Sequence, residues 1–476
     1  MTVTRGWCER WRAQPERAVL VDARDGALLS GADLLDRTAV AAAALAAAGA
    51  APGERVLLSC GPSPETVVAY AAILRLGAAV VPANTGYTRG ELEHIVGDVR
   101  PVVAVVDDRA RLAGLDVRAL TLADLAGAPD RDLLLDAADD DALGMVAYTS
   151  GTTGRPKGAM LSRGNLRAGA EALVEAWEWT PDDRLVHALP MFHMHGLGAA
   201  INGSLTAGAS MVVLPRFDAD AVVEAAHAHG ATMFFGVPTM FARLRDSGRL
   251  PELAHLRLLV SGSAPLDPVL FDAVRRETGQ APVERYGMSE TVMLASNPVR
   301  GERKAGAVGR PLPGVSIRLG EGDGVEVNGP NVFRGYWERP DANATAFTDD
   351  GWFRTGDIGE LDADGYLRLV GRASDLIISG GYNVYPREVE DAVLEHPDVV
   401  DAAVVGVPDD TWGERVVAFV VLRDGTDYDA DGLASALDDH VGTRLAAYKR
   451  PRSWSVRTDL PRNAMGKVLR DQLRTS

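Results

Sequence analysis

The 476-residue chain contains only two cysteines, only four lysines and no early apolar stretch long enough to cross a bilayer. The cysteines, Cys8 and Cys60, form no motif with each other, which excludes a disulfide scaffold and favours a reducing, cytoplasmic setting. The first residues carry charge throughout and lack an apolar core, so we expect no signal peptide. The most apolar early stretch, residues 38–51, is too short to span a membrane, and we predict a buried helix there.

The chain has fewer basic than acidic residues, 49 against 66, and a net charge of -17. The average field repels nucleic acid and anionic membranes, so we expect neither as a partner. Hydrophobic residues make up 46% and charged residues 24%, which excludes a disordered chain and a collagen-like fibre. The length predicts between two and four domains at about 150 residues each.

Lysine is scarce even among the basic residues, because all but four of the 49 are arginine. In such a chain, a lysine is more often retained for its chemistry. The four lysines are Lys157, Lys304, Lys449 and Lys467. Two of them, Lys157 and Lys467, lie in motifs that indicate a function.

The order of apolar segments predicts an α/β fold. Strand-like runs alternate with helical runs in the first half, which predicts parallel sheets covered on both faces. After Val308, short strands with Gly and Asp turns predict a small antiparallel β region. The expected strands are 55–59, 78–82, 102–106, 210–214, 232–235 and 256–260, and the expected helices are 64–76, 91–96, 219–229 and 268–278.

A compact α+β segment is predicted at the C-terminal end. Its expected helices are 386–395 and 428–445, and its expected strands are 399–406 and 414–422. We place a domain boundary before it, at residues 371–375. The chain is therefore expected to have a large N-terminal domain, residues 1–371, and a small C-terminal domain, residues 372–476.

A loop rich in glycine and hydroxyl groups follows the apolar run 145–148. Glycines let backbone N–H groups converge on an anion, hydroxyl groups donate further hydrogen bonds, and a lysine supplies a point charge. The GxxxxGK[ST] spacing is absent, which excludes a P-loop NTPase. We predict a phosphate-binding loop made of Thr149, Ser150, Gly151, Thr152, Thr153, Gly154 and Lys157.

The loop sequence YTSGTTGRPKG at 148–158 resembles the AMP-binding signature of the acyl-activating, or adenylate-forming, superfamily. That superfamily contains acyl-CoA synthetases, peptide-synthetase adenylation domains and firefly luciferase. Five further segments resemble its other motifs in the right order, so that the resemblance covers essentially the whole chain. These segments are 261–265, 284–290, 351–357, 370–381 and 461–467.

The resemblance implies that a carboxylate attacks the α-phosphorus of ATP and that pyrophosphate leaves, so cations must be aimed at the phosphates. Lys467 would contact the carboxylate and the α-phosphate, and Glu290 would hold Mg²⁺, which favours carboxylate oxygen. Asp357 and Arg372 would bind the ribose, and Tyr286 would face the adenine. The other residues expected at ATP or AMP are Gly262, Ser263, Ala264, Glu284, Arg285, Gly287 and Ser289.

For the second half-reaction, the resemblance implies that an acyl-CoA synthetase transfers the acyl group to CoA. Ser379, Gly380, Gly381 and Tyr382 would lie beside the incoming thiol chain, because glycine leaves room for it. The family rotates its small mobile domain about a residue that falls at Ser374. Many relatives carry Asp or Lys there, so this chain departs from the pattern.

The acid is suggested by three segments that look closest to malonyl-CoA and methylmalonyl-CoA synthetases, namely FHMHG at 192–196, VPTMF followed by Arg243, and ERYGMSE at 284–290. His195 would face the acyl group, and Met288 would line its site. Arg243 and Arg285 would together hold the second carboxylate of a small diacid. The segment 378–383 departs from those enzymes, which have lysines at both ends of it.

Several alternatives stay open at this level. The substrate is a small dicarboxylate, such as malonate or methylmalonate, or else a short-chain, medium-chain or aryl monocarboxylate. A stand-alone adenylation enzyme that loads a carrier protein, or that acts on an unusual small acid in secondary metabolism, is a different class. Nothing favours a luciferase-type monooxygenase. We expect ATP, Mg²⁺ and CoA as cosubstrates and cofactor.

Overall fold

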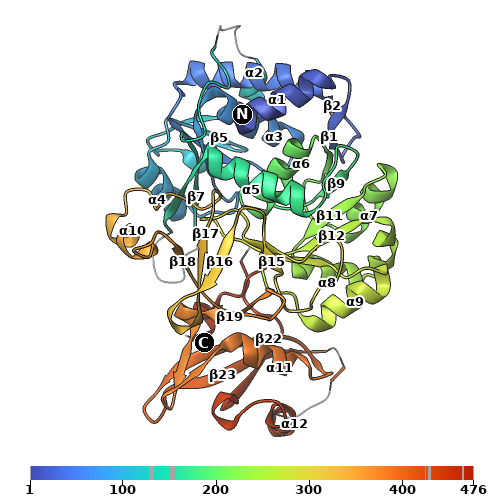
Figure 1. Ribbon diagram of the computed structural model, residues 1–476, viewed down its shortest axis with the longest axis vertical. Coiled ribbons are helices and arrows are strands. Elements are labelled where there is room, and N and C mark those ends of the chain that lie inside the picture. The colour runs from blue at the N-terminus through green and yellow to red at the C-terminus, as the bar shows by residue number, and fades with distance from the viewer. Residues whose placement is uncertain are drawn as a thin grey trace.

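The computed structural model describes residues 2–127, 133–149, 156–423, 425–426, 430–463 and 466–474. A large domain holds two mainly parallel sheets and a small antiparallel sheet, and a small α+β domain lies below it in Figure 1. This arrangement confirms the predicted fold class. Among the described residues, no helix is long and apolar enough to cross a membrane.

The first sheet has six strands within the described residues, in the order β6-β5-β3-β4-β7-β8. Its pairs are parallel except for β7 and β8, which form an antiparallel pair. The predicted phosphate loop therefore joins the two strands of one hairpin. The strands are β3 (Arg55–Ser59), β4 (Ala79–Pro82), β5 (Val103–Val106), β6 (Arg118–Leu120), β7 (Leu143–Tyr148) and β8 (Gly158–Ser162).

The second sheet has nine strands in the described part of the chain, in the order β15-β14-β13-β12-β11-β9-β10-β1-β2. Its centre is parallel and its two edges are antiparallel. The strands are β1 (Ala18–Asp22), β2 (Leu28–Ser30), β9 (Arg184–His187), β10 (Ser210–Val213), β11 (Met233–Gly236), β12 (Leu258–Ser261), β13 (Val283–Tyr286), β14 (Ala295–Ser296) and β15 (Arg310–Pro311).

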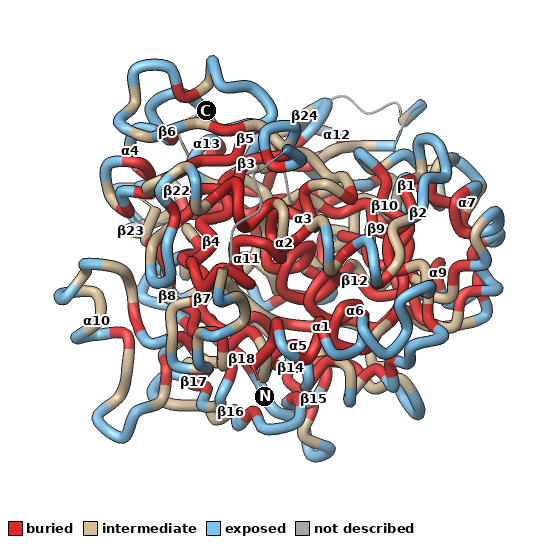
Figure 2. The backbone as a smooth tube through the Cα atoms, turned by 90° about the horizontal axis from the view of Figure 1, so that it is seen from above, coloured by how far each residue is buried: buried red, intermediate tan, exposed pale blue. Residues whose placement is uncertain are grey.

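The helices of the large domain pack against these sheets, and the most buried segments lie around α3 and the strands (Figure 2). Both cysteines lie in this core, and burial raises the pKa of Cys8 to about 12 and that of Cys60 further. The helices are α1 (Val3–Ala13), α2 (Gly31–Ala48), α3 (Pro64–Leu76), α4 (Arg89–Val99), α5 (Arg163–Ala176), α6 (Asn202–Ala207), α7 (Ala219–Ala228), α8 (Pro238–Asp246), α9 (Pro268–Thr278) and α10 (Pro340–Ala346).

The buried helix predicted at 38–51 is α2, which begins and ends earlier than its alanine run suggests. Ser30 accepts a hydrogen bond from the Asp33 N–H, and the Asp33 carboxylate accepts one from the Ser30 N–H in return. This capping box starts the helix at Gly31. The helix ends at Ala48 because Gly49 adopts a left-handed conformation with φ 112°.

A four-stranded antiparallel sheet follows in the described structure, as predicted for the region after Val308. Its strands are β16 (Ser316–Leu319), β17 (Gly324–Asn328), β18 (Phe353–Leu361) and β19 (Leu367–Arg372). The register of the last two places Asp357 opposite Arg372. The two residues that were expected to bind the ribose together thus face each other in one hairpin.

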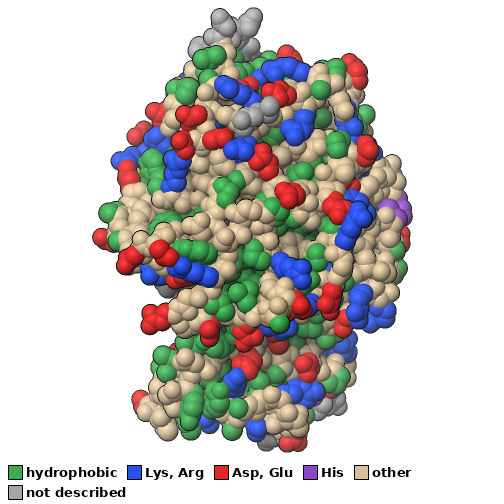
Figure 3. Space-filling model, in the orientation of Figure 1, with side chains coloured by type: hydrophobic (Ala, Val, Ile, Leu, Met, Phe, Trp, Pro, Cys, Tyr) green, Lys and Arg blue, Asp and Glu red, His purple; other side chains and the backbone are tan. Residues whose placement is uncertain are grey.

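In its described residues, the small domain packs three helices on a mostly antiparallel sheet. Its strands are β20 (Ile377–Ser379), β21 (Tyr382–Val384), β22 (Val399–Asp409), β23 (Gly413–Leu422) and β24 (Ser453–Arg457). Its helices are α11 (Pro386–Leu394), α12 (Ala430–Gly442) and α13 (Arg470–Arg474). On the face shown in Figure 3, lysine and arginine side chains are interspersed with acidic ones over both domains.

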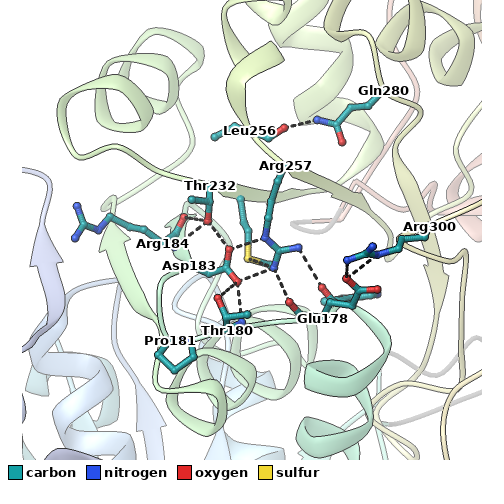
Figure 4. A network of polar contacts seen from close by, with 12 residues as sticks. Glu178, Thr180, Pro181, Asp183, Arg184, Thr232, Leu256, Arg257, Gln280 and Arg300 are labelled. Atoms are coloured by element: carbon teal, nitrogen blue, oxygen red, sulfur yellow. Dashed lines mark hydrogen bonds and ion pairs between the residues drawn. The ribbon is translucent and has the colours of Figure 1, made fainter. Parts of the chain in front are cut away.

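A buried carboxylate ties β9 to its neighbours in the second sheet (Figure 4). Asp183 is 3% exposed and accepts hydrogen bonds from Arg257 Nε at 2.6 Å, Thr180 N at 2.8 Å and Thr232 Oγ1 at 2.8 Å. Burial opposes its ionisation, but these hydrogen bonds, with that from Arg257 the largest, lower the pKa of Asp183 overall. A carboxyl with a lowered pKa stabilises the fold above its unfolded pKa of about 4 and loses that contribution on acidification.

We expect Asp183→Ala to destabilise the large domain by about 2–4 kcal/mol, because donors of three residues, Thr180, Thr232 and Arg257, lose a buried charged acceptor. The apparent midpoint of thermal unfolding at pH 7 measures this, and the deficit should shrink as the pH falls below about 4. Glu178→Gln breaks the exposed Glu178–Arg300 pair in the same view and should leave the midpoint nearly unchanged. Equal midpoints for wild type and Asp183→Ala would contradict the assigned role.

Candidate active site

The first cluster of predicted site residues joins β13 to the β18–β19 hairpin. Tyr286 ends β13, and its hydroxyl donates a hydrogen bond to Asp357. Arg372 Nε lies 2.9 Å from Asp357 Oδ1. Burial raises the pKa of Tyr286 well above its usual value, and the Asp357 charge adds to the shift. The structure thus brings together the aromatic ring, the carboxylate and the guanidinium that were predicted for adenine and ribose.

The second cluster surrounds Glu290. This carboxylate is 5% exposed and accepts a hydrogen bond of 2.9 Å from the Tyr336 hydroxyl. Burial raises the pKa of Glu290. The Lys157 ammonium lies 5.0 Å from the centroid of the same tyrosine ring, so Tyr336 links the two charges. A buried carboxylate with one neutral donor suits a hard cation that shares its other ligands with ATP phosphates, so Glu290 fits the predicted Mg²⁺.

A tight turn sets the direction of Glu290. A side chain at Gly287 would place its Cβ 2.3 Å from the Val292 carbonyl oxygen, so only glycine fits there. Val292 itself has φ 59°, which is unusual for a β-branched residue. Met288 and Ser289, both predicted site residues, lie half-buried within this turn. The close packing fixes the backbone between Tyr286 and Glu290.

The third cluster is a buried group of Arg285, Ser263 and His195. Arg285 Nη2 donates to Ser263 Oγ at 3.1 Å, and Ser263 Oγ lies 3.2 Å from His195 Nδ1. A Cβ at Gly262 would lie 2.4 Å from Arg285 Nε, so glycine makes room for the guanidinium. Ser263, which was predicted for the nucleotide, therefore contacts the predicted acyl residues, and Ala264 follows it half-buried.

Charge in the third cluster is not balanced by any acidic group among the described residues. Arg285 is 5% exposed, its Nε has no partner, and Ser263 is the one side chain that accepts from it in the described structure. Burial lowers the pKa of Arg285, and burial followed by the Arg285 charge lowers that of His195 well below 6.5. His195 is therefore neutral, and its Nε2 has no partner. The group offers donors to an anion.

His195 begins η3 (His195–Ile201), a stretch of π-helix, and is fully buried. Short π-helical segments occur often at functional sites. A Cβ at the next residue, Gly196, would lie 2.2 Å from the Pro190 carbonyl oxygen. This close approach folds the predicted segment back on itself and turns His195 toward Ser263.

The lysine loop of the small domain reaches the first cluster. Asn463 holds the loop closed, because its Oδ1 accepts from Lys467 N at 3.0 Å and its N–H donates to the Lys467 carbonyl at 2.9 Å. Burial lowers the pKa of Lys467, with Arg372 lowering it and Asp375 and Asp357 raising it. Lys467 therefore lies within electrostatic reach of the Asp357–Arg372 pair.

The seat of this loop on the large domain is Thr239, in the first turn of α8. Gly466 has φ 75°, and a Cβ built on it would lie 3.2 Å from Thr239 Oγ1. Sequence reasoning missed Thr239 and Tyr336. Thr239 lies within the VPTMF segment, which the sequence assigned to the acyl site, and Tyr336 belongs to no motif, so the sequence held no signal for either contact.

Two predicted residues lie elsewhere. Glu284 alternates with Arg285 along β13, faces away from the third cluster and accepts from the Gly306 N–H at 3.1 Å. Arg243 is exposed, and its guanidinium carbon lies 5.0 Å from the centroid of the Phe217 ring. Arg243 is thus outside the buried group around Arg285 in this structure, and its expected role at the second carboxylate stays a prediction. Phe241 and Leu244 occupy the buried face of α8, which leaves Arg243 on its outer face.

The residues predicted for CoA form a separate group on the small domain. Gly380 and Gly381 turn β20 into β21 with φ 59° and 81°, and the indole of Trp412 covers Gly380. Tyr382 is exposed and stacks on Tyr448 at 4.7 Å, whereas Ser379 is buried. In the described part of the chain, no hydrogen bond or ion pair joins this group to Arg372.

The predicted hinge residue, Ser374, lies just after β19. It forms part of the short 3₁₀ turn η6 (Ala373–Asp375), directly beyond Arg372. Five residues of the predicted phosphate loop, Ser150, Gly151, Thr152, Thr153 and Gly154, lie outside the described residues. Thr149 and Lys157 flank them, and the Thr149 N–H donates to the Lys157 carbonyl at 3.0 Å.

Comparison with known families identifies the protein family of this chain. A family model described as AMP-binding enzyme matches residues 8–337, and a model of the AMP-binding enzyme C-terminal domain matches residues 388–467. The chain belongs to the AMP-binding enzyme family. The predicted boundary at 371–375 falls in the interval between the two matches and stays a prediction.

The relatives include ligases for different acids. The chain is 37% identical to a mitochondrial malonate–CoA ligase of Mus musculus, over 88% of this chain and 81% of that one. It is 36% identical to an indoleacetate–CoA ligase of Aromatoleum aromaticum, over 96% and 94%. The predicted class, an AMP-forming acyl-CoA synthetase that uses ATP, Mg²⁺ and CoA, is confirmed.

Solved structures agree along the whole chain. ATP-bound MatB from Rhodopseudomonas palustris is 40% identical, with a TM-score of 0.93 and coverage of 100% of this chain and 99% of that one. The apo form of the same protein gives a TM-score of 0.82 at 39% identity and the same coverage. The structure described above thus agrees more closely with the ATP-bound form.

We expect Gly262→Ala to displace the Arg285 guanidinium, because the new methyl group would overlap it. Overpacking of a filled site costs about 1–3 kcal/mol, so the thermal unfolding midpoint should fall and acyl-CoA formation should drop with it. Gly97→Ala is the matched control. Gly97 lies exposed within α4 with open space around its Cβ position, and alanine there should raise stability by about 0.5–1 kcal/mol. Full activity of Gly262→Ala would show that the Arg285 guanidinium tolerates the added methyl group, and would contradict the prediction.

Proposed function

We propose that this acyl-CoA synthetase activates a small dicarboxylate, with malonate or methylmalonate as its substrate. The observation that carries the proposal is the buried Arg285, which lacks an acidic partner among the described residues. An unpaired buried charge is costly. A second carboxylate on the substrate would supply the missing counter-ion. The malonate–CoA ligase among the relatives supports the same acid.

The neighbours of Arg285 are suited to such a carboxylate. The planar fork of arginine binds carboxylate oxygens in pairs, and the charge of arginine persists at neutral pH. His195 is neutral and offers Nε2, which has no partner in the described structure. Behind His195, its ring is stacked at 6.4 Å on Phe235, which packs edge-on against Trp177 and Trp179. This filled aromatic layer favours a small acid over a long one.

In the first half-reaction, the free carboxylate of the acid attacks the α-phosphorus of ATP. A bond forms between the carboxylate oxygen and phosphorus, and the bond to pyrophosphate breaks. We assign Lys467 to the carboxylate and α-phosphate, where it neutralises charge as the bond forms. Asp357 would accept from the ribose hydroxyls beside Tyr286, and Glu290 would hold Mg²⁺. The ion, when bound, neutralises charge on the phosphate oxygens.

In the second half-reaction, the CoA sulfur attacks the carbonyl carbon of the acyl adenylate. A thioester bond forms, the bond to AMP breaks with its electrons going to the phosphate oxygen, and the thiol proton is released. We assign the turn at Gly380 and Gly381 to the thiol chain. A rotation of the small domain about Ser374 would bring that turn to the site and carry Lys467 away.

We expect Lys467→Ala to lower the adenylation half-reaction by several orders of magnitude and to spare thiolation of a supplied acyl adenylate. The reason is that Lys467 would serve the phosphates only before the rotation. Acid-dependent exchange of pyrophosphate into ATP measures the first step, and thioester formation from synthetic malonyl adenylate and CoA measures the second. Equal losses in both steps would contradict a role confined to adenylation.

We expect Arg285→Ala to cripple malonate use, because the second carboxylate would be buried without a partner. Removing one member of a buried pair costs about 3–5 kcal/mol, or roughly a 10²- to 10³-fold loss or more in kcat/KM. Butyrate, which has no second charge, should lose little. Arg275→Ala is the matched control on the exposed face of α9, and it should change kcat/KM for either acid less than about twofold.

Two outcomes of this experiment would count against the diacid. Equal losses of malonate and butyrate in Arg285→Ala would mean that Arg285 supports the fold. Efficient use of indoleacetate by the wild type, with malonate inactive, would favour the aryl acid suggested by the other relative.

A further inference from the structure

Helix α4 carries two polar side chains that reach the ends of the predicted phosphate loop. Figure 1 shows α4 next to β7, the strand that enters this loop. His94 and Asp98 are four residues apart in α4, so they lie on the same face of the helix. His94 is half-buried, and the Asp98 side chain is 11% exposed. Neither residue was expected at the site from the sequence.

Asp98 binds the residue that precedes the loop. Its Oδ2 accepts a hydrogen bond of 2.6 Å from the hydroxyl of Tyr148, the last residue of β7. Burial raises the pKa of Tyr148, and the hydrogen bond to Asp98 adds to the shift, so the phenol stays protonated and donates. A hydrogen bond to an ionised acceptor is stronger than one between neutral groups. Asp98 therefore fixes the point at which the chain enters the loop.

His94 binds the residue before Lys157, at the other end of the loop. Its Nε2 lies 3.1 Å from the Pro156 carbonyl oxygen. A carbonyl oxygen can only accept a hydrogen bond, so the His94 Nε2 carries a proton and donates it. The His94 ring also packs edge-on against the Tyr148 ring, with the two centroids 6.2 Å apart. Helix α4 thus contacts the chain on both sides of the loop.

The two ends of the loop are also joined to each other. The Thr149 N–H donates to the Lys157 carbonyl, and Tyr148 pairs with Gly158 in the register of β7 and β8. The backbone from which the Lys157 side chain extends is therefore fixed by the hairpin and by α4 together.

Asp98 also binds the segment that contacts the Lys157 ammonium. Its Oδ1 accepts from Arg339 Nη2 at 2.6 Å, and its backbone carbonyl accepts from Trp337 Nε1 at 3.3 Å. The same segment carries Tyr336, whose ring centroid lies 5.0 Å from the Lys157 Nζ. The backbone and the ammonium of Lys157 are thus both held by groups that α4 contacts.

We propose that His94 and Asp98 are positioning residues for ATP, because they hold the two ends of the phosphate loop and so place Lys157 for the phosphates. They act through Lys157 rather than by contact with the nucleotide. The inference rests on the predicted contact between Lys157 and ATP, but not on which acid is activated.

The experiment removes the His94 hydrogen bond in the full-length enzyme, with whichever acid the wild type activates. His94→Leu should raise the KM for ATP in acid-dependent pyrophosphate exchange by about two- to tenfold, the range expected for one lost hydrogen bond. The KM for the acid and thioester formation from supplied acyl adenylate should stay unchanged, because neither needs the β- and γ-phosphates. His94→Gln keeps a side-chain N–H donor and should restore most of the affinity for ATP.

A matched control and a second variant accompany this comparison. His440 Nε2 lies 3.0 Å from the Ala392 carbonyl oxygen within the small domain, so His440→Leu removes the same kind of hydrogen bond elsewhere and should leave the KM for ATP unchanged. Tyr148→Phe keeps the ring and removes the hydrogen bond to Asp98. It should reproduce the selective rise in the KM for ATP, and it guards against misfolding of the first variant.

A double variant tests whether the effect passes through Lys157. Lys157→Ala alone should raise the KM for ATP more than His94→Leu does. Adding His94→Leu to Lys157→Ala should then cause little further change, because residues that act through one group are not additive.

Several results would overturn the proposal. They are an unchanged KM for ATP in His94→Leu, Tyr148→Phe or Lys157→Ala, an equal rise in the KM for the acid, the same rise in His440→Leu, and effects that simply multiply in the double variant. A wild type that activates another acid but not malonate would reject the proposed substrate and leave this comparison intact. The two failures are therefore distinguishable.

Discussion

The pairing of Asp357 with Arg372 across the β18–β19 hairpin is the contact on which the site depends. Each residue is fixed by strand register, so the ion pair keeps its place without a flexible loop to hold it. The Tyr286 hydroxyl binds to one end of it, and the charge of Arg372 acts on Glu290 and on Lys467. Residues from the second sheet, the antiparallel sheet and the small domain thus meet around one hairpin.

Three other ionisable side chains of the site region and its surroundings are also buried. Arg285, Glu290 and Glu284 all lie where water cannot stabilise them, and burial shifts the pKa of each toward its neutral form. A fold does not gain stability from such groups. In the reaction proposed above, the substrate's second carboxylate would supply the missing partner of Arg285, and Mg²⁺ would supply that of Glu290.

The elements of the fold could be predicted from the sequence because their signals are local. Apolar runs of β-branched residues form strands, as predicted. The first residues of α2 and α4 differ from the predicted ones because capping boxes at Ser30 and Thr88 start these helices. Motifs assigned Tyr286, Asp357 and Arg372 to one site, and the structure brings their side chains together, while their roles toward the nucleotide stay predictions.

Contacts between distant parts of the chain escaped prediction. Tyr336 contacts Glu290 from a distant part of the chain, and the contact of Thr239 with Gly466 is not part of what its VPTMF segment predicted, so no local pattern indicated either contact. The orientation of Arg243 escaped prediction for a related reason. Its motif gave the residue type and spacing, but Phe241 and Leu244 decide which face of α8 enters the core, and they turn Arg243 to solvent.

The burial of both cysteines gives the chain a property unrelated to its reaction. Cys8 is 1% exposed and Cys60 is 3% exposed, and both thiols are held in their unreactive protonated form. Maleimide reagents should therefore not label the native protein. A surface residue of each domain could therefore be replaced by cysteine and labelled without removal of either native cysteine, so that the distance between the domains could be followed during turnover.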